Sequence, residues 1–305
     1  GAGGIAHPSC GGCFGDVGLA DGSIIEDCHC SGSIRTDVSM NVQSSTEFAV
    51  GGIAGRCFAK ASRCSFTGSL DSHCMASTII AGGVFGILQA NADSCSSDAD
   101  VTMRGSSGMK SGRTMRFGGI AGDCSSGSST ISGCKVSGKL SLNAYDSGSA
   151  SFGGIVGTGN YLSFNDCTNL AAMHTDACVT LGAGGIIGDG SGIDLNRYRV
   201  QGSISAHRPA AGSNIGGLCG SFYASNRNKR IRGGHISCRI DCGSTSGVCS
   251  GIIAGALSVR IAVRIGDPSN PVRIAGCSDV SLDSLFGSIA NSSNYEIDVQ
   301  NVLLE

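Results

Sequence analysis

The sequence predicts an all-β protein that forms a single elongated β-solenoid of about nine coils, with about 34 residues per coil. Three observations predict it. A five-residue glycine motif recurs along the chain at spacings of 31 to 40 residues. A second segment of each repeat alternates between apolar and polar residues, as a half-buried strand does. Finally, Gly supplies 50 of the 305 residues, aromatic residues reach only 5% and Trp is absent. Such a chain cannot fill a thick core at normal packing density.

The motif has the form Gly-Gly-apolar-x-Gly and opens each repeat. Clear copies lie at 51–55, 82–86, 118–122, 153–157, 184–188 and 216–220, and weaker ones at 11–15, 251–255 and 283–287. A corner between strands needs a positive φ or a very tight bend, and glycine permits both. We therefore expect the motif glycines to form the corners of the coils. These structural glycines are Gly51, Gly52, Gly55, Gly82, Gly83, Gly86, Gly118, Gly119, Gly122, Gly153, Gly154, Gly157, Gly184, Gly185, Gly188, Gly216, Gly217 and Gly220.

The second half of each repeat is predicted to be a strand. Residues 28–34, 64–70 and 134–140 share the pattern Cys-x-x-x-Gly-x-apolar. With a period of two, Val136 and Leu140 face one side, and Lys135 and Lys139 face the other. The repeats are shorter than a four-stranded propeller blade and lack its aromatic signature, so coils of a β-helix fit them better.

This two-part layout resembles the GLUG-motif repeats. The best match is the motif at 118–122 followed by Thr130 to Leu142, and the resemblance covers residues 11 to about 290. The extra cysteines and the decayed final copies depart from the family pattern. GLUG repeats occur in large cell-surface and secreted proteins, adhesin-like proteins among them. The resemblance implies a β-solenoid with a structural or binding role and supplies no catalytic residues.

The 17 cysteines indicate an oxidising compartment, and their odd number leaves at least one thiol unpaired within the chain. Several lie close together in the sequence and are disulfide candidates, although spacing alone does not fix the connectivity. The candidate groups are Cys10 with Cys13, Cys57 with Cys64, Cys124 with Cys134, and Cys238 with Cys242 and Cys249.

A further set of cysteines, Cys28, Cys64, Cys95, Cys134 and Cys167, holds the same place in five successive repeats. Stacked coils would bring their Cα atoms about 4.8 Å apart, which lies inside the disulfide window of about 4.4–6.8 Å. Because this position faces inward, the pattern favours a ladder of buried thiols, with disulfide staples between coils as the alternative.

A zinc site is an alternative interpretation of some of these cysteines. Cys10 and Cys13, with Cys28, His29 and Cys30, offer the ligand types of a closed tetrahedral site. Disulfides explain these cysteines better in so cysteine-rich a chain, so we predict no metal site and no cofactor.

No catalytic residues are predicted. Asp16, Asp123 and Asp189 each follow a motif glycine, but they belong to coils that are not adjacent, and Asp is a common turn residue. The net charge of −2 does not favour nucleic acid as a partner, and no apolar run is long enough to cross a membrane as a helix. A basic segment is a candidate contact for a polyanion such as an acidic glycan, with a solvated loop as the alternative. It contains Arg227, Lys229, Arg230 and Arg232.

The sequence divides into a solenoid, 1–290, and a terminal segment, 291–305. The glycine-free stretch from Tyr295 to Leu304 is strand-like. It either completes the last coil or is donated to another copy of the chain. We expect a secreted or cell-surface location, with any signal peptide removed or outside this chain.

The expected function is that of an extracellular structural protein, the disulfide-stapled subunit of a fibre, filament or surface appendage that assembles through its ends. The alternative is an adhesin that recognises glycans or a host protein. A polysaccharide-cleaving β-helix enzyme is the least favoured interpretation.

Overall fold

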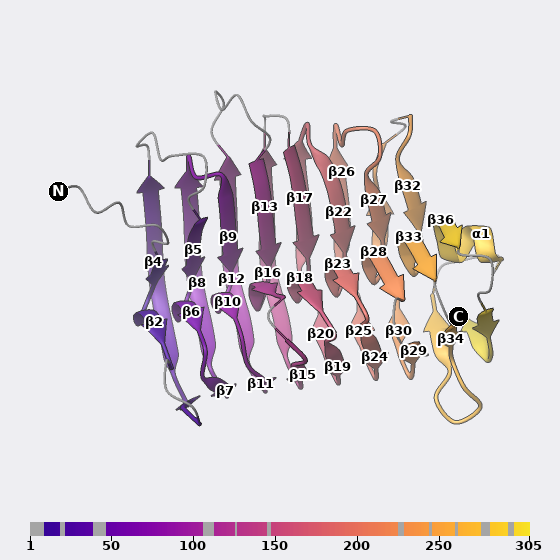
Figure 1. Ribbon diagram of the computed structural model, residues 1–305, viewed down its shortest axis with the longest axis horizontal. Helices are drawn as coiled ribbons and strands as arrows, with labels where there is room; N and C mark the ends of the chain where they lie inside the picture. The colour runs from indigo at the N-terminus through magenta and orange to yellow at the C-terminus, as the bar shows by residue number, and fades with distance from the viewer. Residues whose placement is uncertain are drawn as a thin grey trace.

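The predicted fold class is confirmed. The computed structural model describes residues 9–18, 22–38, 47–105, 113–125, 127–144, 148–224, 229–243, 246–259, 262–275, 281–291 and 296–305. They form a β-solenoid of parallel sheets with about 34 residues per turn. Figure 1 shows the strands stacked side by side along the long axis of the molecule. The one helix in these ranges is a single turn, α1 (Leu282–Leu285).

Each coil contributes to four sheets, which we name A to D in the order in which the chain meets them. Sheet A contains β1 (Ser9–Gly11), β5 (Glu47–Gly51), β9 (Thr78–Gly82), β13 (Arg113–Gly118), β17 (Gly148–Gly153), β22 (Thr180–Gly184), β27 (Asn214–Gly216) and β32 (Cys249–Gly251). Sheet B contains β2 (Phe14–Val17), β6 (Ala54–Cys57), β10 (Phe85–Leu88), β14 (Ala121–Cys124), β18 (Val156–Asn160), β23 (Ile187–Ser191), β28 (Cys219–Ala224), β33 (Ala254–Val259) and β36 (Phe286–Asn291).

Sheets C and D form the rest of each coil. Sheet C contains β3 (Ile24–Glu26), β7 (Lys60–Ser62), β11 (Ala92–Asp93), β15 (Thr130–Ser132), β19 (Ser163–Asn165), β24 (Asp194–Asn196), β29 (Lys229–Arg232), β34 (Ala262–Ile265) and β37 (Glu296–Val299). Sheet D contains β4 (His29–Val38), β8 (Ser65–Cys74), β12 (Ser96–Gly105), β16 (Lys135–Ala144), β20 (Thr168–Asn169), β21 (Ala172–Ala177), β25 (Arg199–Val200), β26 (Ser203–His207), β30 (His235–Ile236), β31 (Arg239–Asp241), β35 (Val272–Ile274) and β38 (Val302–Leu304).

The number of turns is slightly lower than predicted. About seven full turns separate β1 from β32, the first and last strands of sheet A, whereas the repeats predicted nine coils. A last partial coil follows, in which α1 precedes β36 where a sheet A strand precedes sheet B in the other coils. The decayed motif at 283–287 lies at this irregular place.

The terminal segment belongs to this molecule's own last coil. β37 pairs in parallel with β34, and β38 pairs with β35. The structure therefore agrees with the first of the two alternatives for this segment. Tyr295 lies outside the described residues.

The alternation predicted for the second half of the repeat is confirmed in β16. Val136, Leu140 and Leu142 are fully buried, while Lys135 and Lys139 are exposed. The same inward positions of neighbouring strands stack into columns, for example Leu70, Val101 and Leu140. These columns build one continuous core along the axis.

The motif glycines lie in a row along the axis, as expected. Gly51 is in register with Gly11 on one side and Gly82 on the other, and the row continues to Gly251. None of the eighteen predicted structural glycines has a positive φ. They are required by close packing, because a Cβ on any of them would lie under 3.0 Å from another atom. On Gly52, for example, it would meet the ring of Phe66 in sheet D.

Sheets A and B also pack against each other outside the main core, along what we call the seam. The seam consists of the residue two before the first motif glycine and the residue five after it in each coil. In two coils the seam partners match in chemistry: Ile80 and Ile87 belong to a separate apolar cluster, and Arg116 pairs with Asp123. In two others they do not, since Ala49 lies opposite Arg56 and Gly182 opposite Asp189. The third motif glycine makes the contact possible, since a Cβ on Gly55 would meet the backbone of β1.

Candidate functional site

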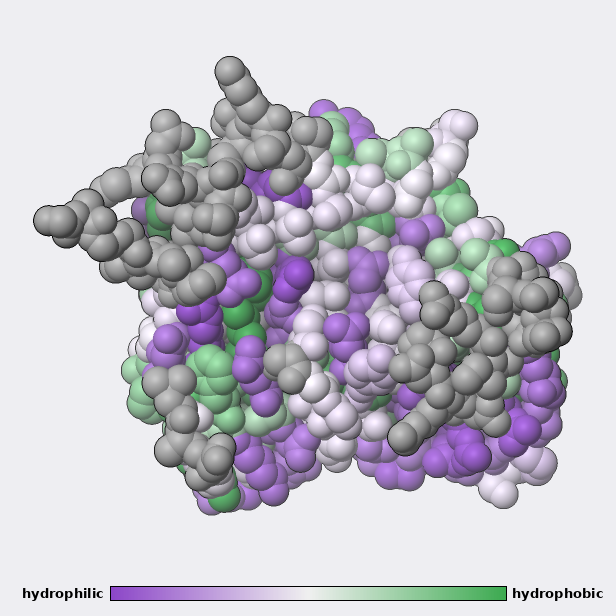
Figure 2. All heavy atoms as spheres, in the orientation of Figure 1, coloured by the Kyte–Doolittle hydropathy of each residue, from purple (hydrophilic) through white to green (hydrophobic). Residues whose placement is uncertain are grey.

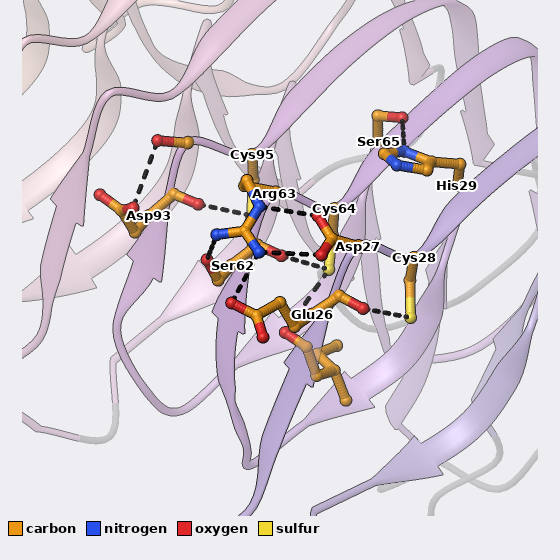
Figure 3. A network of polar contacts seen from close by, with 12 residues as sticks. Glu26, Asp27, Cys28, His29, Ser62, Arg63, Cys64, Ser65, Asp93 and Cys95 are labelled. Atoms are coloured by element: carbon orange, nitrogen blue, oxygen red, sulfur yellow. Dashed lines mark hydrogen bonds and ion pairs between the residues drawn. The ribbon is translucent and has the colours of Figure 1, made fainter.

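The thiol ladder predicted from the repeats is present at the corner between sheets C and D. Each of its thiols donates to the carbonyl oxygen two residues earlier in the chain. The distances are 3.7 Å for Cys28, 3.5 Å for Cys64, 3.5 Å for Cys95, 3.4 Å for Cys134 and 3.5 Å for Cys167. Figure 3 shows three rungs, Cys28, Cys64 and Cys95, with the ion-paired Arg63 beside them.

The geometry of the corner explains this hydrogen bond. The residue before each ladder cysteine has a positive φ, for example 51° at Arg63 and 56° at Asp166. Through this conformation the chain turns from sheet C into sheet D. The carbonyl two residues before the cysteine accepts a hydrogen bond from a backbone N–H of the preceding coil, for example from Gly133 to Asn165 at 2.9 Å. The cysteine thiol is a second donor to this carbonyl, so these cysteines contribute to the corner as well as acting as small apolar groups.

Two of the ladder thiols, Cys95 and Cys167, are poor nucleophiles. The hydrogen bond with Cys134, followed by burial, raises the pKa of Cys95 to about 12. Burial raises the pKa of Cys167 to about 12 as well. Because the thiolate is the reactive and metal-binding form, these thiols stay protonated and inert at neutral pH.

Coil register, and not closeness in the sequence, decides which of the other cysteines are neighbours. Cys57 and Cys124 share one column, with Leu88 between them, while Cys64 and Cys134 belong to the ladder. Cys249 is in register with Asn214 of the seam, Cys238 approaches the Gly217 carbonyl at 3.9 Å, and Cys242 is half-buried. All sixteen described cysteines are free thiols. The disulfide candidates therefore remain predictions, and Cys277 lies outside the described residues.

A hollow on the surface lies at the same corner, further along the axis. It has a volume of about 640 Å³ and is lined by Arg197, Arg199, His235 and Arg273, together with Asp166. Arg199, His235 and Arg273 stack in register in three successive coils of sheet D. The hollow forms where Gly233 and Gly234 continue the corner without side chains. The ladder ends beside it at Tyr198, whose ring would collide with a Cβ on Gly234.

A second hollow, of about 470 Å³, lies on the sheet C side of the corner. Its lining includes Arg230 and Arg232 with Asn165, Asn196 and Asp194. Figure 2 shows hydrophilic residues gathered along the lower edge of the face in view, where Figure 1 places the sheet C strands. We call the two together the basic hollows.

Acidic neighbours neutralise most of the positive charge of the basic hollows. Arg197 pairs with Asp166 at 2.6 Å and Arg273 with Glu305 at 2.7 Å. The hydrogen bonds from these guanidinium groups lower the pKa values of Asp166 and Glu305. Among the described residues, the side chain of Arg199 has no hydrogen bond or ion pair.

The predicted polyanion contact is only partly assembled. Lys229 is buried, with its ammonium 3.2 Å from Asp194, so it does not face solvent. Arg232 lies 3.7 Å from Asp267, Arg230 is exposed, and Arg227 lies outside the described residues. Sequence analysis missed Arg197, Arg199, His235 and Arg273 because they come from different coils. The signal that could have found them is their recurrence at the spacing of the repeat.

The three carboxylates that directly follow a motif glycine occupy the seam. Asp16, Asp123 and Asp189 are in strands of sheet B, not in turns as the sequence suggested. Thr158 separates Asp123 from Asp189 in the column, so they do not form an acid–base pair. Asp189 accepts a hydrogen bond from Ser151, and burial raises its pKa.

The described part of the chain brings together no group of three or more His, Cys, Asp or Glu side chains that could hold a metal ion. Within the same ranges, no helix is long and apolar enough to cross a membrane. Comparison of the chain with family models, with curated proteins and with solved structures finds no match.

Proposed function

We propose that the chain is a structural, non-catalytic protein of the cell exterior: a stiff β-solenoid rod that stacks end to end with further copies of itself. The observation that carries this proposal is the set of apolar side chains exposed on the first and last described coils, where the core columns end. The axial ion pairs and the thiol ladder support the stiffness of the rod.

Charged side chains tie neighbouring coils together along the axis. Most ion pairs among the described residues join side chains one coil apart, at distances from 2.6 to 3.7 Å. Exposed pairs contribute little free energy individually, but each one fixes the register of one coil on the next. The pairs are Arg63 with Glu26 and Asp27, Arg104 with Asp71, Arg197 with Asp166, Arg208 with Asp176, Lys229 with Asp194, Arg232 with Asp267, Arg264 with Asp298, and Arg273 with Glu305.

Both ends of the solenoid expose large apolar side chains. In the first coil, Phe14 is 39% exposed, and in the last coil Val299 and Leu304 are exposed. Ile24 and Leu303 are exposed as well, but they lie on the outer face of the rod, in register with Lys60 and Arg273. Strand edges with apolar side chains favour pairing with another strand.

The two ends match in register. Val299 and Ile25 are the two ends of a single inward column of sheet C. Leu304 and Cys30 likewise end one column of sheet D. A second copy placed one coil spacing beyond the last coil would therefore set apolar groups on apolar groups in parallel strands. This match between ends selects another copy of the chain as the partner.

The test compares two lysine variants. Val299→Lys places a charge on the open end, while Leu170→Lys places one on the side of the rod, where the side chain is 38% exposed against 39% for Val299. Sedimentation velocity and electron microscopy over a range of concentrations measure the length of the particles. We expect rods several molecules long from the unchanged chain and from Leu170→Lys, and single rods from Val299→Lys. Single rods from the unchanged chain at every concentration would refute the proposal.

A second candidate function, the binding of an anionic polysaccharide, is favoured by the basic hollows. In the row of Arg199, His235 and Arg273, the last two side chains pair with Glu305. The exposed side chain of Arg199 is therefore the group of this row left to bind an anionic ligand. Binding of heparin, measured by calorimetry at low and high salt, tests this function. Arg199→Ala should weaken the binding, whereas the control Lys139→Ala, an exposed charge elsewhere on sheet D, should not. Equal losses in the two variants would indicate nonspecific attraction.

A further inference from the structure

The first coil carries cysteine at two positions where the other coils do not. Cys13 is the apolar residue of the glycine motif, and Cys30 is the first inward residue of β4. The residues equivalent to Cys13 are Ile53, Val84, Ile120, Ile155, Ile186, Leu218, Ile253 and Leu285. Those in register with Cys30 are Phe66, Ser97, Val136, Asn169, Val200, Ile236, Ile274 and Leu304. The two cysteines therefore occur together and only in this coil.

These two positions face each other across the coil. The motif bend presses against the inward residue of sheet D, so that a Cβ on Gly119 would meet Val136 and one on Gly185 would meet Val200. In the first coil the equivalent Cβ, on Gly12, would lie 2.6 Å from the Cys30 sulfur. The thiol of the next residue, Cys13, is in hydrogen-bond contact with Cys30.

The neighbouring thiols are engaged differently. Cys28 belongs to the ladder, where it donates to the Glu26 carbonyl and contacts Cys64. Cys10 is in register with Val50 in sheet A. Cys13 is exposed and Cys30 is half-buried, so a small oxidant can reach the pair. Of the ladder thiols, Cys28 is half-buried as well, and the other four are buried and protected.

We propose that Cys13 and Cys30 form a disulfide that closes the first coil from the motif bend to sheet D. The oxidant is a low-molecular-weight disulfide such as oxidised glutathione. The Cys13 thiolate attacks one glutathione sulfur and the first glutathione thiolate leaves. The Cys30 thiolate then attacks the Cys13 sulfur and releases the second. Two thiols of the protein become one disulfide, one glutathione disulfide becomes two thiols, and the two protons pass to the departing thiolates.

The occurrence of this bond in vivo rests on the oxidising location proposed above, but the test does not. The purified, reduced chain is incubated with oxidised glutathione, remaining thiols are blocked with N-ethylmaleimide, and the digest is mapped by tandem mass spectrometry without reduction. We expect a peptide that joins Cys13 to Cys30 and the loss of maleimide from both residues, with the ladder cysteines still alkylated after unfolding.

Two variants make the outcome decisive. Cys30→Ser should leave Cys13 as a glutathione adduct, whereas Cys178→Ser, which removes another exposed thiol, should leave the cross-link intact. Recovery of Cys13 joined to Cys10 or Cys28, or as a glutathione adduct in the unchanged chain, would overturn the assignment. Particle length in the sedimentation assay is measured separately, so a failure of this bond is distinguishable from a failure of end-to-end stacking.

Discussion

The third motif glycine provides a direct test of how the coils pack. In Gly122, an added Cβ would lie 2.6 Å from the side chain of Ile80 and 2.7 Å from the carbonyl oxygen of Ala81, both in the preceding coil. The equivalent glycine of the first coil, Gly15, would meet only Ser9, at 3.5 Å, which is an ordinary contact. Both glycines have φ values outside the left-handed region. The same substitution at the same motif position therefore differs only in the presence of a coil beneath it.

The two substitutions are expected to change the free energy of unfolding in opposite directions. At Gly122 the Cβ must displace backbone, so we expect Gly122→Ala to lower the free energy of unfolding by ~3 kcal/mol, the upper range of overpacking costs. At Gly15 the alanine fits, and it reduces the conformational entropy of the unfolded chain. Gly15→Ala should therefore raise the free energy of unfolding by about 0.4–1 kcal/mol.

Urea denaturation followed by far-UV circular dichroism measures both variants against the unchanged chain. The urea concentration at the midpoint of unfolding should fall for Gly122→Ala and should stay the same or rise for Gly15→Ala. Equal losses in both variants would show that this motif position needs glycine for its backbone conformation and not for the approach of the neighbouring coil.

Three further predictions concern titratable and thiol groups. Burial raises the pKa of Asp189 in the folded state, so its contribution to stability is greatest below the unfolded value of about 3.9 and is lost as the pH rises through the folded pKa. Asp189→Asn should therefore raise the urea midpoint at pH 7 and have little effect at pH 3; the reverse order would contradict this. Cys167→Ala removes the second donor to the Asn165 carbonyl, which still accepts from the Gly133 N–H, and should cost about 0.5–1.5 kcal/mol in urea denaturation, whereas Cys167→Ser should keep part of the stability; equal losses would argue against a contribution of the thiol hydrogen bond. Burial and the contact with Cys30 raise the pKa of Cys13, so its pairing rate with Cys30, followed by quenched mass spectrometry, should increase from pH 7 to pH 9, and a flat profile would refute thiolate attack as the slow step.

Patterns that repeat along the chain made the fold predictable. The spacing of the glycine motif predicted the coil length, and the alternation of Val136 and Leu140 with Lys135 and Lys139 predicted the inner and outer faces of sheet D. These features depend only on local periodicity. The seam was not predictable in this way, because it depends on how sharply the chain bends between sheets A and B.

Groups brought together by register were the hardest to predict. Cysteines close in the sequence, such as Cys57 and Cys64, suggested pairs, yet Cys64 stacks on Cys95 one coil away. The basic segment at 227–232 suggested one cluster, yet Lys229 points to Asp194, and the hollow beside it is lined by Arg199 and other side chains from other coils. The exact register of irregular repeats of 31 to 40 residues decides these neighbours, and composition does not reveal it.

The seven-residue separation of seam partners has a consequence for how such a protein can change. The two members of the charged seam pair Arg116 and Asp123 lie within a single repeat, so that repeat can be duplicated, deleted or exchanged without leaving either charge unpaired, whereas Asp189 depends on Ser151 of the preceding coil. The axial ion pairs differ, because each one joins side chains of two neighbouring repeats, and exchanging one repeat alone would separate the partners. Seam residues whose partner lies in the same repeat can therefore vary from one repeat to the next, whereas the axial ion pairs restrict which repeats can follow one another.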